Sequence, residues 1–287
     1  MFKSILLISP FSLFIFSAFV FSISDLSAQT GTVSPFQWHQ VQQGLCYCET
    51  DAPERSILND SRIFILKADP VYCNFTILTA SENKHQNRTA DVWAKDFGMT
   101  VIVNAGMFNT ANQTTSKGYL KNHSHFNNRR LNGKYNVMMA MNPADPADTS
   151  MIIADMTCRN WESLRLRYHT LCQGMRMIDG NGKPMAWDKR PGQSCSMVVG
   201  ATDNAGHIYF VFTRSPYTHQ QMITFLFGLI PNIKTTVYLE GGPEASLYLK
   251  SRGTIIAKYG SYVSKTYAND KNDHFWKIPN VIAVRLR

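Results

Sequence analysis

The fold is constrained most by a set of short apolar runs that are rich in branched and aromatic residues and are separated by polar turns. Such runs predict β-strands. They occupy residues 61–69, 73–80, 100–104, 151–155, 207–213 and 235–239. Helical spacing is rarer: residues 222–229 repeat apolar side chains at i, i+3, i+4 and i+7, and Thr89 can begin a short helix that Gly98 ends. We therefore expect an α+β or mixed α/β fold, a single domain with a mixed β-sheet flanked by helices.

The N-terminus has the composition of an export signal. Lys3 supplies a basic start, residues 5–21 are apolar, and residues 24–28 are small. An uncleaved membrane anchor is the alternative, since the apolar run is nearly long enough to span a bilayer. We expect residues 1–28 to be the signal or anchor, 29–60 an N-terminal extension, and 61–287 the domain. The protein is then exported, to a periplasm or beyond the cell.

The formal charge of +9 limits the partners. Outside the cytoplasm it favours anionic partners such as phosphorylated glycans, acidic polysaccharide or anionic lipid head groups. The basic residues are scattered, so no stripe for nucleic acid is visible. We expect a sugar-phosphate or glycan substrate, no nucleic acid, no partner protein, and membrane association only through the N-terminal segment.

Six cysteines make an even set in a chain expected to reach an oxidising compartment, which favours disulfide bonds. They are Cys46, Cys48, Cys73, Cys158, Cys172 and Cys195. Their pairing cannot be read from the sequence. Metal binding and a catalytic thiolate are the other uses of such residues, although the spacing matches no structural zinc site.

Polar side chains end two of the expected strands. Asn104 follows VIV and is followed by Ala-Gly, and Glu240 follows VYL and is followed by Gly-Gly-Pro. The carboxyl ends of parallel strands are where open α/β sheets keep their sites, and small residues there let a ligand approach the backbone. The polar segment 110–135 reads as a long surface loop, a type that often lines a site. An ordinary strand-ending turn or a helix cap is the alternative reading of either strand end.

Five segments, in order, resemble the phosphodiester glycosidase family, which includes an enzyme that removes a sugar from a sugar phosphodiester and many exported bacterial proteins of unknown substrate. The segments are VNAGMF at 103–108, SKGYLKN at 116–122, QGMRMIDGNGKP at 173–184, SMVVGATDNAGHIYFVFT at 196–213 and LEGGPEASLY at 239–248. Residues matching the family's motifs are Asn104, Gly106, Gly118, Gly174, Asp179, Gly241 and Gly242. Glu240 stands where the family usually has Asp. An Arg common before the fourth segment is replaced by Cys195-Ser196, so Arg176, Arg190 or Arg214 would have to substitute for it.

The resemblance implies a hydrolase that cleaves the glycosidic bond of a sugar-1-phosphodiester without a cofactor. We expect Glu240 as base or nucleophile, Asn104 as a group that positions a substrate hydroxyl or acetamide, and Arg176 with Arg214 as phosphate clamps. Glu244 is a candidate second acid or a rim residue.

Gly106, Gly118, Asp179, Gly241 and Gly242 complete the expected substrate site. Whether a metal takes part is not visible in the spacing of the His and Asp residues. The alternatives are an exported glycan- or sugar-phosphate-binding protein without turnover, and a structural envelope protein.

Overall fold

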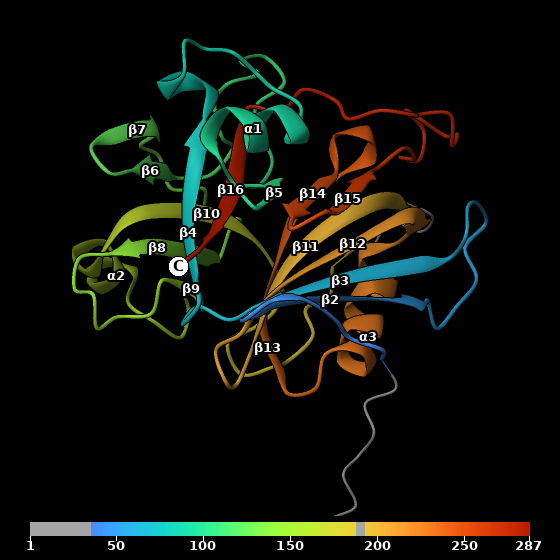
Figure 1. The fold of residues 1–287 in the computed structure, drawn as a ribbon, viewed down its shortest axis with the longest axis horizontal. Coiled ribbons are helices and arrows are strands. Elements are labelled where there is room, and N and C mark those ends of the chain that lie inside the picture. The colour runs from blue at the N-terminus through green and yellow to red at the C-terminus, as the bar shows by residue number, and fades with distance from the viewer. Residues whose placement is uncertain (1–35, 188–192) are drawn as a thin grey trace, which may run out of the picture. The chain divides into compact units, whose positions relative to one another are not determined.

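The computed structural model describes residues 36–187 and 193–287, and Phe36–Arg287 form one compact unit. Within the described residues two β-sheets face each other (Figure 1). The larger sheet has the order β1-β2-β3-β12-β11-β13-β10-β6-β7, and β8 pairs with both β10 and β9. The smaller has the order β15-β14-β5-β16-β4.

The strands of the larger sheet are β1 (His39–Gln42), β2 (Leu45–Asp51), β3 (Arg62–Ala68), β6 (Leu120–Asn122), β7 (His125–Asn128), β8 (Val137–Pro143), β9 (Met151–Asp155), β10 (Tyr168–Ile178), β11 (Cys195–Asp203), β12 (Ile208–Tyr217) and β13 (Ile233–Gly241). Those of the smaller sheet are β4 (Cys73–Thr79), β5 (Val101–Asn104), β14 (Ser246–Ser251), β15 (Thr254–Tyr259) and β16 (Asn280–Leu286). The helices are α1 (Ala90–Phe97), α2 (Trp161–Arg167) and α3 (His219–Leu229), with 3-10 helices η1 (Ala80–Glu82) and η2 (Gly242–Glu244).

The main hydrophobic core lies between the two sheets. Phe210 and Leu239 of the larger sheet belong to the same buried cluster as Ile77, Val103 and Ile282 of the smaller sheet. Alternate residues of each strand point into this core, as the period of two requires. The distance between the sheets is therefore set by side chains from both.

Helices cover the outer faces of the sheets. Met222, Phe225 and Leu226 of α3 pack on the larger sheet, and Trp93 of α1 packs on β5, β14 and β16 of the smaller one (Figure 1). Gly98 ends α1 in the left-handed conformation, as the sequence predicts. The layers within the described unit are thus helix, smaller sheet, larger sheet and helix, and strands such as β11 are buried on both faces.

Three sequence-based expectations need correction. The single unit with flanking helices is present, but every strand pair among the described residues is antiparallel, so the expected mixed sheet and its parallel strand ends are not. Part of the segment 29–60, set apart as an extension, supplies β1 and β2 of the larger sheet. The loop at 110–135 contains the hairpin β6–β7. The expected signal or anchor at 1–28 lies outside the described residues.

The expected disulfide bonds are also not present, because all six cysteines are free thiols in the structure. Cys46 and Cys48 stand two residues apart on β2, where an extended chain separates their Cα atoms by roughly 6.6 Å and points both side chains the same way. Cys172 lies inside the core, and its thiol contacts the carbonyl oxygen of Ala105.

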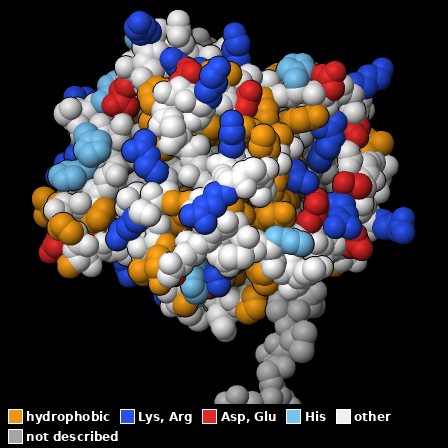
Figure 2. All heavy atoms as spheres, viewed as in Figure 1, with side chains coloured by type: hydrophobic (Ala, Val, Ile, Leu, Met, Phe, Trp, Pro, Cys, Tyr) orange, Lys and Arg blue, Asp and Glu red, His pale blue; other side chains and the backbone are white. Residues whose placement is uncertain are grey.

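The surface shows mixed charge. On the face drawn in Figure 2, Lys and Arg side chains are spread out with acidic side chains between them. This agrees with the scattered basic residues of the sequence. Across residues 36–187 and 193–287, no helix is long and apolar enough to cross a membrane.

Candidate active site

Glu240 is a buried carboxylic acid near the end of β13, with only 7% of its surface exposed. Burial raises its pKa to about 8, and the charge of Glu244 adds to the effect; the Gly241 N–H, 3.1 Å from Glu240 Oε1, and the charge of Lys117 act in the opposite direction. Glu240 therefore keeps its proton at neutral pH. Burial of Tyr135 raises the pKa of its hydroxyl to about 12, and the charge that Glu240 carries at such a high pH adds to the effect.

The β-sheet is irregular at Glu240. Val198 of β11 pairs with Glu240, whereas the next residue, Val199, pairs with Tyr238, so β13 carries an extra residue at this point. A β-bulge changes the direction in which a side chain points and often lies beside a functional site. On its other side β13 pairs with β10 as far as Tyr238, which lies opposite Met175, so the bulge begins where this pairing ends.

Gly241 and Gly242 make the turn that follows Glu240 possible. A Cβ at Gly241 would overlap the Tyr238 hydroxyl and lie 2.9 Å from Cys195 Sγ. Gly242 has φ +72°, in the left-handed region that favours glycine. The chain then forms η2, which places Glu244 on the same cavity as Glu240. Burial also raises the pKa of Glu244.

Asn104 joins the end of β5 to this turn. Its Nδ2 donates to the Glu244 carbonyl oxygen at 3.0 Å, and its Oδ1 accepts from the Ser246 N–H at 2.7 Å. The side chain is buried, with 2% exposed. The structure therefore brings together the two strand ends that the sequence singles out, although they belong to different sheets. Asn104 contacts the backbone that carries Glu244 rather than the cavity.

A cavity of about 240 Å³ lies over the two carboxyl groups. Lys117 and Lys277 supply positive charge at its edge, and both are exposed. The remaining walls combine apolar and polar side chains. They are Met107, Phe108, Thr110, Gln113 and Trp276. A cavity with apolar walls, paired carboxyls and cations can hold a sugar ring that carries an anionic group.

Gly106 and Gly118 allow the backbone beside the cavity to take its conformation. Gly106 has φ +97° and directly precedes Met107. A Cβ at Gly118 would lie 2.8 Å from the Gln173 carbonyl oxygen and 2.9 Å from Cδ2 of Tyr135. Only glycine fits so close to a neighbouring strand, and Lys117 is placed at the cavity as a result.

Arg176 and Asp179 are engaged elsewhere. Arg176 Nη1 lies 2.7 Å from Asp155 Oδ2, and the Asp155 side chain has no exposed surface. Burial alone would raise the pKa of Asp155, but hydrogen bonds from Thr157, the Gly180 N–H and Arg176 hold it below its usual value. Asp179 Oδ1 accepts from the backbone N–H groups at 181 and 183 and so closes a turn. Neither residue lines the Glu240 cavity.

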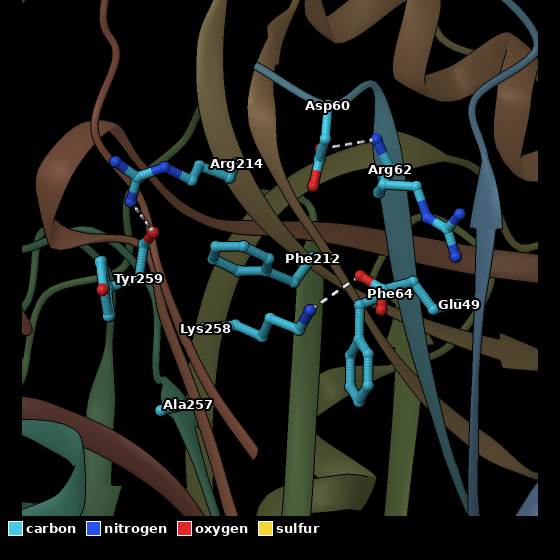
Figure 3. Close-up of a pocket in the computed structure, with 9 residues that line it drawn as sticks. All are labelled: Glu49, Asp60, Arg62, Phe64, Phe212, Arg214, Ala257, Lys258 and Tyr259. Carbon is cyan, nitrogen blue, oxygen red and sulfur yellow. Dashed lines mark hydrogen bonds and ion pairs between the residues drawn. The ribbon is translucent and has the colours of Figure 1, made fainter. Parts of the chain in front are cut away.

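Arg214 lines a second cavity of about 240 Å³, between β2, β3, β12 and β15 (Figure 3). The charged groups there are already paired: Lys258 Nζ lies 2.7 Å from Glu49 Oε1, and Arg62 Nη1 lies 3.2 Å from Asp51 Oδ1. Arg214 itself points away from Glu49 and contacts the segment after β15. The two expected phosphate clamps are thus outside the Glu240 cavity.

Several residues of the cavity were not found by sequence reasoning. Thr110, Gln113 and Lys117 lie in the polar segment 110–135 that the sequence does mark as a possible site loop. Trp276 and Lys277 come from the segment between β15 and β16, which shows no motif. No local pattern could have placed them beside Glu240, because their position depends on long-range contacts.

Cys195 lies beside the turn that follows Glu240, where a Cβ at Gly241 would come 2.9 Å from its Sγ. Burial raises the pKa of Cys195 to about 12, so its thiol stays protonated at neutral pH. Among the residues that the structure describes, no three His, Cys, Asp or Glu side chains are grouped so that they could hold a metal ion.

Comparisons with known proteins identify the family and the fold. Residues 97–285 match the family model of the phosphodiester glycosidases. The fold is similar to the catalytic domain of zebrafish N-acetylglucosamine-1-phosphodiester alpha-N-acetylglucosaminidase, auto-inhibited by its pro-peptide, with 15% identity, 88% of each chain covered and a TM-score of 0.59.

The fold is also similar to a hypothetical protein from Synechocystis, with 12% identity, 88% of this chain and 64% of that chain covered, and a TM-score of 0.56. No curated protein matches significantly. Since the family model covers most of the chain, the protein belongs to the phosphodiester glycosidase family.

Proposed function

We propose that the protein is an exported hydrolase that cleaves the glycosidic bond of a sugar-1-phosphodiester in the Glu240 cavity. The observation that carries the proposal is a pair of carboxyl groups, Glu240 and Glu244, sharing one cavity with Lys117 and Lys277 in a chain of this family. The zebrafish relative is named for an N-acetylglucosamine-1-phosphodiester, which supports this class of substrate.

The burial of Glu240 changes the role expected from the sequence. With a pKa of about 8 it is neutral at pH 7, so we assign it as the acid instead of the base or nucleophile. A neutral carboxyl group does not repel the anionic diester. It can donate a hydrogen bond, and then its proton, to the bridging phosphate oxygen as the bond from that oxygen to the sugar C1 breaks.

Glu244 takes the complementary role. The charges of two nearby carboxyl groups repel each other, so a Glu240 that keeps its proton leaves Glu244 without that repulsion. The Glu244 carboxylate can accept a proton from the water whose oxygen bonds to C1. The products are the free sugar and a phosphate monoester, and transfer of that proton to solvent and reprotonation of Glu240 complete the cycle.

The cations and Asn104 serve the same step in different ways. Lys117 and Lys277 would hold the phosphate oxygens, in place of Arg176 and Arg214. Asn104 holds the backbone of Glu244, so its contribution is to fix the second carboxyl group.

The proposal is tested by phosphate-monoester release from a panel of sugar-1-phosphodiesters. The wild type should turn over at least one of them, and Glu240→Gln should lose this activity while its melting temperature stays at or above that of the wild type. Glu162→Gln, which removes an exposed carboxylate from α2, is the control and should keep full activity. Binding of the same compounds without turnover by the wild type would instead identify a non-catalytic binding protein, a reading favoured by the absence of an arginine among the described residues that line the Glu240 cavity. Arg190, the third arginine named from the sequence, lies outside the described residues.

A further inference from the structure

The segment between β15 and β16, residues 260–279, forms part of the Glu240 cavity although it contains no helix or strand. Long segments of this kind inside a compact domain usually have a binding role. We call it the 260–279 loop. Trp276 and Lys277 are its contribution to the cavity, so its conformation sets one wall of the candidate active site.

Arg214 of β12 binds this loop at several points. Its Nη1 donates to the Tyr259 carbonyl oxygen at 3.0 Å, just before the loop, and its Nη2 donates to the Asn272 carbonyl oxygen at 2.7 Å. Nη2 also lies 2.7 Å from Asp270 Oδ1. Figure 3 shows the bond to Tyr259 on the side of the cavity away from Glu49. The planar guanidinium can reach all of these acceptors at once, which an ammonium cannot.

Asn272 carries the connection from Arg214 to the cavity wall. Its Oδ1 accepts from the indole Nε1–H of Trp276 at 3.1 Å, and its Nδ2 donates to the carbonyl oxygens of Gly260 and His274 at 2.7 and 2.9 Å. The ring of Tyr267 packs edge-on against Trp276, with centroids 5.2 Å apart. The indole is therefore fixed by a hydrogen bond and by a ring contact.

We propose that Arg214 is a positioning residue for the Glu240 cavity: through Asn272 it holds Trp276 as the wall against which the sugar ring binds, and Trp276 thereby determines which sugars fit. This proposal rests on the proposed function for its substrate class. The flat face of an indole suits the apolar face of a sugar ring. The hydrogen bond from the indole N–H to Asn272 keeps the ring of Trp276 in this orientation. Arg214 is then not a phosphate clamp, because its donors are directed at the loop.

The test uses Arg214→Lys with Arg62→Lys as the matched control. Both residues are arginines of adjacent strands in the larger sheet, both line the Figure 3 cavity and both form an ion pair, but the contacts of Arg62 Nη1 lead to Asp51 and not to the loop. In Arg214→Lys we expect KM for the sugar phosphodiester to rise about tenfold, the effect of one or two lost hydrogen bonds, with kcat nearly unchanged. Arg62→Lys should keep both constants.

A double-mutant cycle separates positioning from general stability. If Arg214 acts through Trp276, the rise in KM caused by Arg214→Lys should nearly disappear in a Trp276→Ala background. Trp276→Ala should also bring the KM values of different sugars closer together. The proposal would be overturned if the KM increases of the two single substitutions multiply in the double mutant, or if Arg214→Lys lowers kcat by as large a factor as it raises KM.

A measurement without turnover keeps the test independent of the proposed function. In ¹⁵N-labelled protein the indole N–H signal of Trp276 can be assigned with Trp276→Phe. The signal should shift or broaden in Arg214→Lys and stay in place in Arg62→Lys. If no sugar phosphodiester is turned over, the proposed function fails, and this signal still tests the link from Arg214 to Trp276. An unchanged signal in folded Arg214→Lys would show that the link does not exist; should that variant not fold, Arg214→Gln, which also removes the forked donors, takes its place with the same two outcomes.

Discussion

The burial of Glu240 predicts a specific dependence of stability on pH. In the unfolded chain this carboxyl group loses its proton near pH 4.5, whereas in the folded protein it does so near pH 8. Between these values the unfolded state has released the proton and the folded state still holds it, so rising pH favours unfolding. The stabilising effect of the neutral group is complete below about pH 4.5 and is lost as the pH rises through 8.

The size of the effect follows from the difference between the two pKa values. Each pH unit between 4.5 and about 8 changes the free energy of unfolding by about 1.4 kcal/mol, which sets a ceiling of about 5 kcal/mol. Glu240→Gln removes the titrating group but keeps an oxygen for the Gly241 N–H. The variant should therefore be more stable than the wild type at high pH, by about 2 to 5 kcal/mol.

The assay is urea denaturation of both proteins at intervals from pH 5 to pH 9. The difference in unfolding free energy between Glu240→Gln and the wild type should grow up to about pH 8 and then level off. Glu162→Gln, the exposed control, should follow the wild type throughout. Parallel curves for wild type and Glu240→Gln over the whole range would show that the carboxyl group is not held neutral, and the assignment of Glu240 as the acid would fall with it.

Further predictions concern the same site. If Glu240 is the acid, kcat/KM should fall as the pH rises through about 8; a rise through that pH in a pH–rate profile would make Glu240 the base. Lys117→Met should raise KM for a sugar phosphodiester about tenfold but leave binding of the free sugar unchanged, which calorimetry can compare; equal losses for both ligands would contradict a phosphate contact. Asn104→Ala removes two buried hydrogen bonds and should cost about 2 to 4 kcal/mol in urea denaturation, and a loss below about 1 kcal/mol would show that the bonds to the Glu244 turn matter little. Gly118→Ala should destabilise by about 1 to 3 kcal/mol, because its methyl group meets Gln173 and Tyr135; an unchanged midpoint would show that the strands can move apart.

The local elements were predictable because their signals are local. Branched and aromatic runs mark β3, β4, β5, β9, β12 and β13, and Thr89 with Gly98 marks α1. The direction of strand pairing was not predictable, since a buried strand has the same apolar composition in parallel and antiparallel sheets when both faces are covered. β11, buried throughout, is such a strand.

The candidate site was predictable only in part, for a related reason. Asn104 and Glu240 were found because each follows a strand and precedes small residues. The arginines were assigned by charge alone, and a charge gives no information on which partner it will meet: Arg176 meets Asp155, and Arg214 meets the 260–279 loop. Trp276 was missed because its position depends, through the neighbouring Asn272, on Arg214, which is far away in sequence.

Glu240 and the asparagine that holds the Glu244 turn belong to opposite halves of the sandwich. Glu240 ends a strand of the larger sheet, and Asn104 ends a strand of the smaller one, so the side chains packed between the sheets act as the spacer that sets the geometry of the cavity. A substitution that thickens or thins this spacer by a methyl group would alter the cavity long before the protein unfolds. The cavity should then respond to core packing sooner than the melting temperature does, and α1 is tied to the same region because Trp93 Nε1 donates to the carbonyl oxygen of Ile278, next to Lys277.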